Sequence, residues 1–483
     1  MNIIYKKRSD RLNKEDLFLN GKIGKTILKL SLPLVLSQLI NVLYNIVDRI
    51  YIGNMKDIGE IALAGVGITF PIILIVSAFA ALVGFGGGPI FSIRLGEGKK
   101  LEAKNTMMNS LVMLVITGVI LSIVLMVFAE PLLYFFGATS EIIGYSKDYL
   151  IIYAFGTISV MLTLGLTSYV TAQGNSIMAM IVVIIGAVAN IILDPIFMFG
   201  LNMGVKGAAL ATIISQTLSA IFVIWFLLSD KSVVKISFKN FKLNRKIILS
   251  IIALGVSPFI MQATESAVQI VFNIQITKYG GNDYKTYLNL MTIMLSIMQF
   301  IVLPIIGFAQ GASPLISYNY GANRIDRVKS AFKFLFIVSF AFSATFYIFL
   351  LASPSTFVSI FNSDPKLLSI APNIIRVFFL GMSVMGIQIA CQNTFMALGQ
   401  SLVSLILAAL RKIILLIPLA FILPKLCGIN GVFYAEFTAD IIAVLITVIV
   451  FFTMFNKILK RKENVDSLDY SKSVVNNYVE EGV

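Results

Sequence analysis

Histidine is absent from this chain of 483 residues, and cysteine occurs only twice. Without histidine the chain lacks both the usual proton carrier at neutral pH and the commonest metal ligand, so any proton chemistry must use Asp or Glu. Cys391 and Cys427 form no CxxC motif, and neither a disulfide framework nor a zinc site is indicated. Charged residues make up only 13% of the chain, against about 25% in average globular proteins.

Apolar residues dominate instead, at 58% of the chain. A membrane-spanning helix needs roughly 20 mostly apolar residues, and the chain contains twelve segments of that kind. The sequence therefore predicts an all-α, multi-pass membrane protein rather than a soluble one. The predicted segments are 26–53, 59–86, 105–129, 142–172, 176–200, 207–229, 246–277, 286–312, 328–352, 370–398, 402–424 and 430–456.

The net charge of +14 is explained by orientation rather than by nucleic acid. If the N-terminus is cytosolic, the inner tails and loops hold 26 Lys and Arg residues and the outer loops hold seven. Basic residues accumulate on the cytosolic side of membrane proteins. We therefore expect both termini in the cytosol, with residues 1–25 and 457–483 as cytosolic tails, the second of them disordered. The N-terminus does not resemble a cleaved signal peptide.

The two halves of the chain repeat each other at a spacing of 225 residues. GPIFSIRLGEGK at 88–99 aligns with SPLISYNYGANR at 313–324. The matched positions are Pro33 and Pro258, Pro89 and Pro314, Ser92 and Ser317, Gly96 and Gly321, Gly156 and Gly381, and Gly174 and Gly399. Because each half holds six segments, the repeats have the same orientation, an arrangement known in transporters. This predicts two six-helix lobes related by pseudo-two-fold symmetry.

The predicted domain boundaries follow from the repeat. The N-lobe spans 26–230, a basic cytosolic linker spans 231–245, and the C-lobe spans 246–456. A substrate path between the lobes would be lined by polar residues of the first segment of each lobe. The candidates are Gln38, Asn41, Tyr44 and Asn45 in the N-lobe and Gln262, Glu265, Gln269 and Asn273 in the C-lobe.

The first segment also carries Asp48, on the same helical face as Asn41, Tyr44 and Asn45. A carboxylate inside a membrane costs about 3 kcal/mol on insertion scales, and such groups usually face an aqueous path or a protein interior. A face that only packs against neighbouring helices is the alternative, but packing does not require an acid. The stripe therefore favours an ion or proton site.

These patterns resemble the MATE family of multidrug and toxic compound extrusion transporters, most closely its bacterial DinF/MepA-like branch. The likeness covers residues 25–455 and rests on five motifs taken in order. They are PLVLSQLINVLYNIVD in the first segment, RLGEGK after the second, QGN after the fourth, NIILDP in the fifth and GVKGAALAT entering the sixth. The resemblance implies drug efflux driven by Na⁺ or H⁺ re-entry, with no other cofactor. It also implies an ion site formed by Asp48, Asn190, Asp194 and Thr212.

Depth in the membrane supports that set independently. Asp48, Asp194 and Thr212 each lie five or six residues from a glycine at the outer end of their segment, which is about 7–9 Å. Their oxygens suit Na⁺, a hard cation, and if H⁺ is the coupling ion an acid must carry it. A polar break beside Pro195 is the structural alternative for Asp194.

The C-lobe lacks equivalents of these acids but has charges of its own. Glu265, Arg411 and Asp440 all fall near the bilayer centre by residue count, so we expect them to form one charge cluster because an unpaired buried charge is costly. Lys412 and Glu436 are further buried charges of this lobe. In related NorM-type MATE proteins an acid of the seventh segment serves a cation site. Glu265 could have that role or could form a structural ion pair, and both alternatives stay open.

The leading functional hypothesis is a multidrug antiporter in the plasma membrane that exports cationic or amphipathic drugs as a monomer. The alternative is a flippase for lipid-linked saccharides, because the related superfamily shares the two-lobe design. Such a flippase would need cations in its cavity to bind a pyrophosphate. An integral-membrane enzyme is disfavoured because the sequence shows no nucleophile–base set and no metal cluster. A purely structural or receptor role would not explain the repeat with its buried acids.

Overall fold

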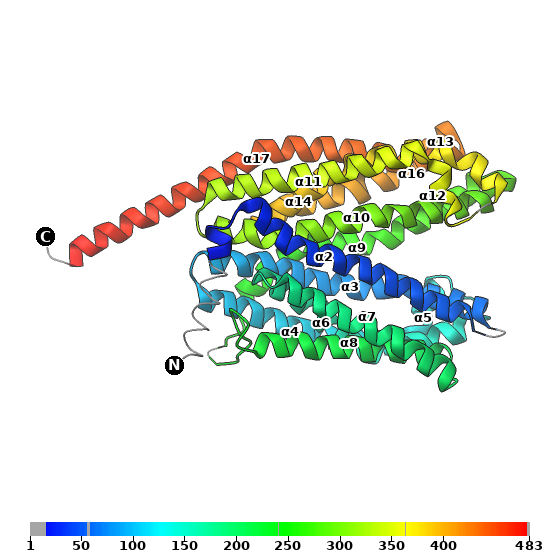
Figure 1. The fold of residues 1–483 in the computed structure, drawn as a ribbon, viewed down its shortest axis with the longest axis horizontal. Coiled ribbons are helices and arrows are strands. Elements are labelled where there is room, and N and C mark those ends of the chain that lie inside the picture. The colour runs from blue at the N-terminus through cyan, green and yellow to red at the C-terminus, as the bar shows by residue number, and fades with distance from the viewer. Residues whose placement is uncertain (1–15, 56–57, 240, 363, 481–483) are drawn as a thin grey trace.

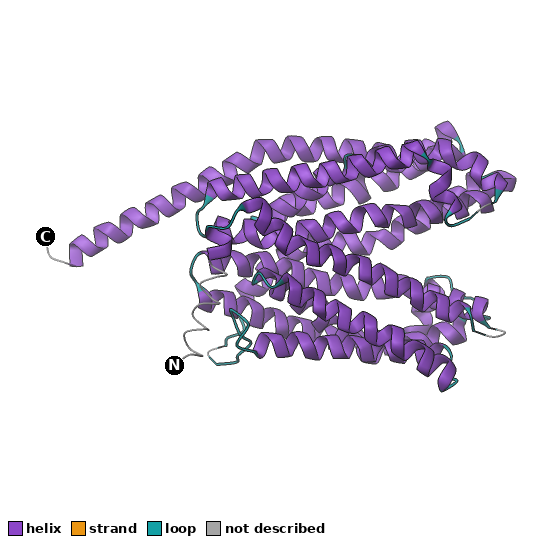
Figure 2. Cartoon of the chain, in the orientation of Figure 1, coloured by secondary structure: helices purple, strands orange, loops and turns teal. Residues whose placement is uncertain are grey.

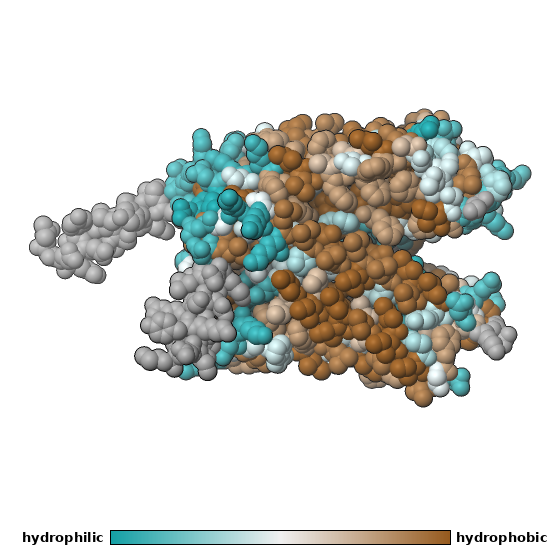
Figure 3. All heavy atoms as spheres, in the orientation of Figure 1, coloured by the Kyte–Doolittle hydropathy of each residue, from teal (hydrophilic) through white to brown (hydrophobic). Residues whose placement is uncertain are grey.

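The computed structural model describes residues 16–55, 58–239, 241–362 and 364–480. Within these ranges the chain folds into helices joined by short loops, with no strand (Figure 2). Twelve of the described helical spans are long and apolar enough to cross a membrane. On the face shown in Figure 3, apolar residues form a broad band between two more polar ends, as expected for a bilayer-embedded protein.

The helices form two bundles that lie one above the other in Figure 1. The N-lobe bundle contains the helices of the first half of the chain. They are α2 (Ile23–Gly53), α3 (Gly59–Gly96), α4 (Lys100–Val127), α5 (Ala129–Phe135), α6 (Ile143–Ala172), α7 (Ser176–Pro195), which continues as a π-helical turn (Ile196–Gly200), and α8 (Val205–Leu228).

The C-lobe bundle contains the helices of the second half. They are α9 (Arg245–Tyr279), a 3₁₀ turn (Gly281–Asp283), α10 (Tyr284–Gly321), α11 (Ile325–Ala352), α12 (Pro354–Ser359), α13 (Pro365–Met382), α14 (Met385–Ala397), α15 (Ser401–Ala409), a π-helical turn (Leu410–Leu416), α16 (Ile417–Cys427) and α17 (Ile429–Glu480). The helix α17 continues through the charged segment that was expected to be disordered. Its Lys, Arg and Glu residues are good helix formers, and they extend a helix that already exists.

The lobes touch at one end of the bundle and separate at the other. We call the end where α2 begins the base and the opposite end the mouth. At the mouth, the space-filling view shows a notch between the two bundles (Figure 3). The lobes contact each other through α3 against α9 and α2 against α10, two pairs that the 225-residue repeat relates to each other, and also through α3 against α10.

Glycines bring the lobes together toward the base. A Cβ atom at Gly96 would lie 2.0 Å from the carbonyl oxygen of Tyr318, and one at Gly321 would lie 2.1 Å from that of Ile93. Deeper in the bundle, a Cβ at Gly255 would lie 1.8 Å from the carbonyl oxygen of Leu82. These distances are too short for any side chain, so the backbones of the two lobes pack directly on each other.

Candidate functional site

The polar stripe of α2 ends at Asp48, in the half of the helix nearer the mouth. The Oδ1 atom of Asp48 is buried and has no hydrogen-bond partner. The guanidinium of the neighbouring Arg49 lies over the Phe70 ring, 5.2 Å from its centre, and it acts on Asp48 at longer range through its charge. The acid is therefore placed to receive a ligand rather than to hold a fixed ion pair.

A second acid lies on α7, which packs against α2. The Asp194 side chain is fully buried. Its Oδ1 accepts a hydrogen bond of 3.1 Å from Nδ2 of Asn190, one helical turn away, and the same amide nitrogen lies 3.5 Å from Oγ1 of Thr212 on α8. Asn190, Asp194 and Thr212 thus lie together, as the resemblance implied.

The end of α7 explains why Asp194 is held in this place. Pro195 follows it directly and has no N–H to donate, so the regular hydrogen-bond pattern cannot continue. The chain widens there into the π-helical turn Ile196–Gly200, a distortion often found at functional sites. Small residues of α8 allow this approach, since a Cβ at Gly207 would lie 2.7 Å from the backbone of Phe197.

Three residues of this N-lobe site carry unpartnered oxygens, and its two acids lie within electrostatic range of each other. Besides Oδ1 of Asp48, both Oδ2 of Asp194 and Oδ1 of Asn190 are buried without a hydrogen-bond partner. Buried polar atoms are normally satisfied, so three orphaned oxygens need an explanation. An oxygen-only donor set with two carboxylates fits a hard cation such as Na⁺, or protons bound to the acids. Among the described residues, no group of three or more His, Cys, Asp or Glu side chains is suited to a metal ion.

One residue of this site was missed by the sequence analysis. The Tyr149 side chain on α6 is within hydrogen-bonding reach of Thr212 and within electrostatic range of Asp48 and Asp194. Its ring stacks on that of Tyr153, with centroids 6.4 Å apart and planes at 14°. The sequence did offer one indication of this role. Tyr149 lies near the mouth end of its segment, at about the same depth in the membrane as the two acids.

The C-lobe contains a second set of buried charges. The Nε atom of Arg411 lies 2.7 Å from Oδ1 of Asp440, and its Nη2 lies 3.1 Å from Oε1 of Glu436. Lys412 forms an ion pair with Glu265. All but Glu265 are almost fully buried, and the Glu265 side chain keeps 33% of its exposure.

This arrangement changes the cluster expected from the sequence. Arg411 does pair with Asp440, but Glu265 takes Lys412 as its partner, and Glu436 joins the arginine. The two cations lie next to each other on the π-helical turn Leu410–Leu416. This turn ends two residues before Pro418, which cannot donate a helical hydrogen bond. Adjacent residues point in different directions on a helix, so each cation reaches a different acid.

The C-lobe network carries more acid than base. With all groups ionised, three carboxylates face two cations, and Oδ2 of Asp440 is buried without a hydrogen-bond partner. Gly381 leaves room for this acid, because a Cβ there would lie 2.7 Å from the Asp440 Cβ. The network is nevertheless mostly paired, unlike the N-lobe site.

The predicted cavity residues lie on α2 and α9. Gln38 contacts Gln310 of α10, with 3.4 Å between Nε2 and Oε1, and Asn45 donates to the carbonyl of Asn41 at 2.7 Å. Oε1 of Gln262 is buried without a partner. The remaining predicted residues, Tyr44, Gln269 and Asn273, are half-buried or exposed.

A surface hollow of about 430 Å³ lies elsewhere, between the mouth ends of α4, α5 and α6. It is lined by residues that include Glu130, Tyr134 and Lys147. It contains none of the predicted site residues, and the N-lobe and C-lobe charges remain the chemically distinctive features of the molecule.

Comparison with known proteins gives consistent matches over both halves. The MatE family model matches residues 33–196 and 258–422. The multidrug export protein MepA of Staphylococcus haemolyticus is 27% identical over 449 residues, covering 93% of this chain and 97% of that protein. MepA of Staphylococcus aureus strain MSSA476 is 27% identical over 441 residues, covering 91% and 96%.

Solved structures share the fold. One is described as the outward-facing conformation of a multidrug resistance MATE family transporter, and it aligns with a TM-score of 0.84 at 22% identity, covering 92% of this chain and 98% of its own. A transporter from Pyrococcus furiosus, described as having a binding pocket of reverse polarity, aligns with a TM-score of 0.85 at 22% identity and the same coverage.

Proposed function

This chain belongs to the MatE family, and from that premise we propose that it is a secondary active multidrug exporter. It exchanges cationic or amphipathic compounds for H⁺ or Na⁺ by alternating access of its two lobes. The multidrug export proteins that match almost its whole length support this assignment. Belonging to a transporter family, the chain is assigned no catalytic activity.

The observation that carries the proposal is the group of unpartnered oxygens in the N-lobe. Asp48, Asn190 and Asp194 each supply a buried oxygen that has no hydrogen-bond partner among the described residues. Na⁺ would be held by these oxygens with Thr212, whereas H⁺ would be held on one of the carboxylates. In either case the site can change its charge during a cycle, which coupling to an ion gradient requires.

The arrangement of the lobes supports alternating access. They are closed on each other at the base and separated at the mouth. The excess of basic residues in the loops at the base favours a cytosolic base, so this conformation is open to the outside of the cell. Parallel repeats typically rock as rigid bodies about a fixed site. We assign the protein to the plasma membrane as a monomer with both termini in the cytosol.

The C-lobe charges are assigned two roles. Arg411 with Asp440 and Glu436 holds α15–α17 together, because all three are buried and mutually bonded. Glu265 is the exposed member of the network and meets cationic drugs in the cavity, in competition with Lys412. A lipid-linked saccharide flippase remains the alternative function, but both cations near the cavity are engaged with carboxylates, which disfavours pyrophosphate binding.

Transport in inverted membrane vesicles tests the proposal. A pH gradient and a Na⁺ gradient are imposed separately, and accumulation of the fluorescent cation ethidium is followed. We expect one of the two gradients to drive accumulation and its collapse to stop it. Accumulation that needs neither gradient, or none with either, would refute a secondary antiporter.

A further inference from the structure

The segment before α2 crosses from one lobe to the other at the base. Residues 16–22, which we call the strap, lead into the first helix of the N-lobe. Phe18, within the strap, is only 3% exposed. Its ring stacks on Tyr318 of the C-lobe helix α10, with centroids 5.0 Å apart and planes at 25°.

The backbone of the strap is bound to the C-lobe as well. The carbonyl oxygen of Phe18 accepts hydrogen bonds from Nη2 of Arg327 at 3.0 Å and from Nδ2 of Asn319 at 3.1 Å. The carbonyl oxygen of Gly21 accepts a further bond from Nη2 of Arg327 at 2.7 Å. Hydrogen bonds from a charged donor are stronger than neutral ones, so this attachment is specific.

Contacts within the C-lobe, independent of the strap, orient the Arg327 side chain. Its Nε donates to Oδ1 of Asn319 at 3.2 Å, and the Nδ2 of the same asparagine also donates to the Leu315 carbonyl at 2.8 Å. Arg327 and Asn319 therefore form a preorganised pair of donors at the base ends of α10 and α11. A backbone carbonyl of the strap occupies the point where their donors converge.

The outer edge of the Phe18 ring, at its Cζ atom, lies against the N-lobe. Gly174, in the loop between α6 and α7, has a φ of +76°, and a Cβ there would lie 3.0 Å from the Phe18 ring. Only a glycine combines this backbone conformation with room for the ring. Phe18 is thus inserted between Tyr318 of one lobe and Gly174 of the other.

We propose that the strap is a latch that stabilises the conformation closed at the base, with Phe18 as its wedge and Arg327 as its anchor. The inference rests on the proposed alternating-access cycle. When the lobes part at the base, Tyr318 and Gly174 must separate, so Phe18 loses one of its two contacts. Opening toward the base therefore requires that the strap release one lobe.

The populations of the two conformations test the latch directly. Cysteines replace Glu141 and Lys285, exposed residues at the mouth ends of α6 and α10, in a full-length background in which Cys391 is replaced by Ala and Cys427 by Ser. Spin labels on the two sites report the distance between the lobes at the mouth. The measurement uses neither drug nor ion gradient, so it can succeed or fail independently of the transport function.

We expect Phe18→Ala and Arg327→Ala each to raise the mouth-closed population about fivefold relative to the parent, the effect of losing about one net hydrogen bond or contact. The double variant should exceed either single variant only slightly, because both act through one strap. Phe238→Ala, an exposed aromatic of the linker, and Arg324→Ala, an exposed arginine three residues before the anchor, are the matched controls.

A second readout covers variants that fold poorly. Ile93→Cys places a thiol at the base interface, where a Cβ added to Gly399 of the other lobe would lie 3.7 Å from the Ile93 side chain. The maleimide labelling rate of this thiol should rise when the base opens. Phe18→Leu, which keeps an apolar side chain but loses ring stacking, should raise that rate less than Phe18→Ala. Distance distributions and labelling rates that match the parent in both Phe18 and Arg327 variants would overturn the latch.

Discussion

Asn190 donates a hydrogen bond from Nδ2 to Oδ1 of Asp194 at 3.1 Å, one turn along α7, and leaves Oδ2 of the same carboxylate buried without a partner. The amide thereby fixes the direction in which the free oxygen points. An acid that is oriented but not neutralised is suited to a reversible ligand.

Replacing either acid of the N-lobe site should therefore uncouple transport. Asp48→Asn and Asp194→Asn keep the shape of the side chain but remove the charge, and we expect each to abolish gradient-driven ethidium efflux while expression stays normal. Asp148→Asn is the matched control, because Asp148 is an exposed acid near the mouth end of α6 that pairs with Lys206. Normal efflux by both site variants would show that these acids do not carry the coupling ion.

The family motifs predicted Asp48, Asn190, Asp194 and Thr212 as one set, and the structure places Asn190, Asp194 and Thr212 together, whereas their role in ion binding stays a prediction. Residue counts place Asp48, Asp194 and Thr212 near the outer ends, and Asn190 follows from one helical turn. Tyr149 shares this depth, but it was missed because a tyrosine in an apolar segment, unlike an acid, does not stand out by its charge. Its role depends on how α6 packs against α8, which is a long-range relationship.

The fold shows the same division between local and long-range information. Hydropathy indicates where a helix crosses the lipid, so the twelve spans were predicted. It does not indicate where a helix ends, and α3 and α10 continue to Gly96 and Gly321 instead of ending near 86 and 312. Their last turns face the other lobe, and glycine and polar residues suit that contact although they weaken the apolar pattern. The pairing of Glu265 with Lys412 rather than with Arg411 likewise depends on a π-helical turn that the sequence pattern does not show.

Removing Arg411 should lower the stability of the C-lobe strongly. Arg411→Ala leaves Glu436 and Asp440 buried without their cation, and breaking a buried pair in this way typically costs about 3–5 kcal/mol. Thermal melting and folded yield of the purified protein measure the loss. Lys147→Ala, which breaks an exposed pair with Glu130, should leave the melting temperature almost unchanged, because solvent screens exposed ion pairs.

Neutral replacements separate the structural from the functional role of this network. The triple variant Arg411→Met, Glu436→Gln and Asp440→Asn has no buried charge to compensate and should recover most of the melting temperature lost in Arg411→Ala. If the triple variant melts as low as the single one, unpaired charge is not the cause of the loss.

Substitutions of Lys412 and of Glu265 should change the affinity for cationic drugs in opposite directions. Lys412→Met frees the partly exposed Glu265 carboxylate, so the KM for cationic drugs should fall while that for neutral drugs stays unchanged. Glu265→Gln should raise the KM for cationic drugs and spare neutral ones. The double variant Lys412→Met, Glu265→Gln should bind cationic drugs as weakly as Glu265→Gln does. Its folded yield should exceed that of Glu265→Gln, because it leaves no unpaired buried lysine. Equal effects on cationic and neutral drugs would place Glu265 outside the drug path.

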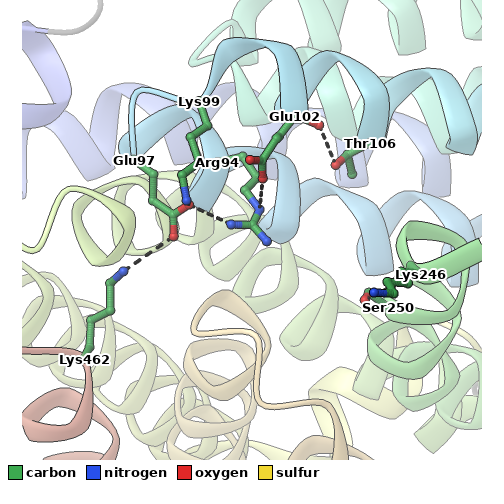
Figure 4. A network of polar contacts seen from close by, with 8 residues as sticks. All are labelled: Arg94, Glu97, Lys99, Glu102, Thr106, Lys246, Ser250 and Lys462. Atoms are coloured by element: carbon green, nitrogen blue, oxygen red, sulfur yellow. Dashed lines mark hydrogen bonds and ion pairs between the residues drawn. The ribbon is translucent and has the colours of Figure 1, made fainter. Parts of the chain in front are cut away.

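Glu97 should make the closed base sensitive to acid. Burial raises the pKa of this carboxyl, but the hydrogen bond and charge of Arg94, with Lys99 and Lys462, outweigh burial and hold the pKa below its ordinary value of 4.5. Lys462 belongs to α17, so its contact with Glu97 at 3.5 Å joins the lobes at the base (Figure 4). A lowered folded-state pKa means that the ionised form stabilises the fold, and this stabilisation is lost as the pH falls through that pKa.

The test compares melting temperatures of the parent and Glu97→Gln across pH. The parent should melt higher by a constant margin above about pH 5, and the margin should vanish as the pH falls below 4.5 and through the lowered pKa. Glu102→Gln, at a half-exposed partner of Arg94, serves as the control and should show a smaller margin. A margin that changes between pH 6 and 8 would contradict this assignment, because Glu97 stays ionised throughout that range.

Ion binding by the purified protein tests the central claim most directly. Radioactive Na⁺ binding is measured at equilibrium, and proton release on addition of ethidium is followed in weakly buffered solution, for the parent, Asp194→Asn and Asp148→Asn. The account predicts that the parent binds Na⁺ or releases protons, that Asp194→Asn does neither, and that Asp148→Asn behaves like the parent. Na⁺ binding or drug-induced proton release that persists unchanged in Asp194→Asn would contradict an ion site built on Asp194.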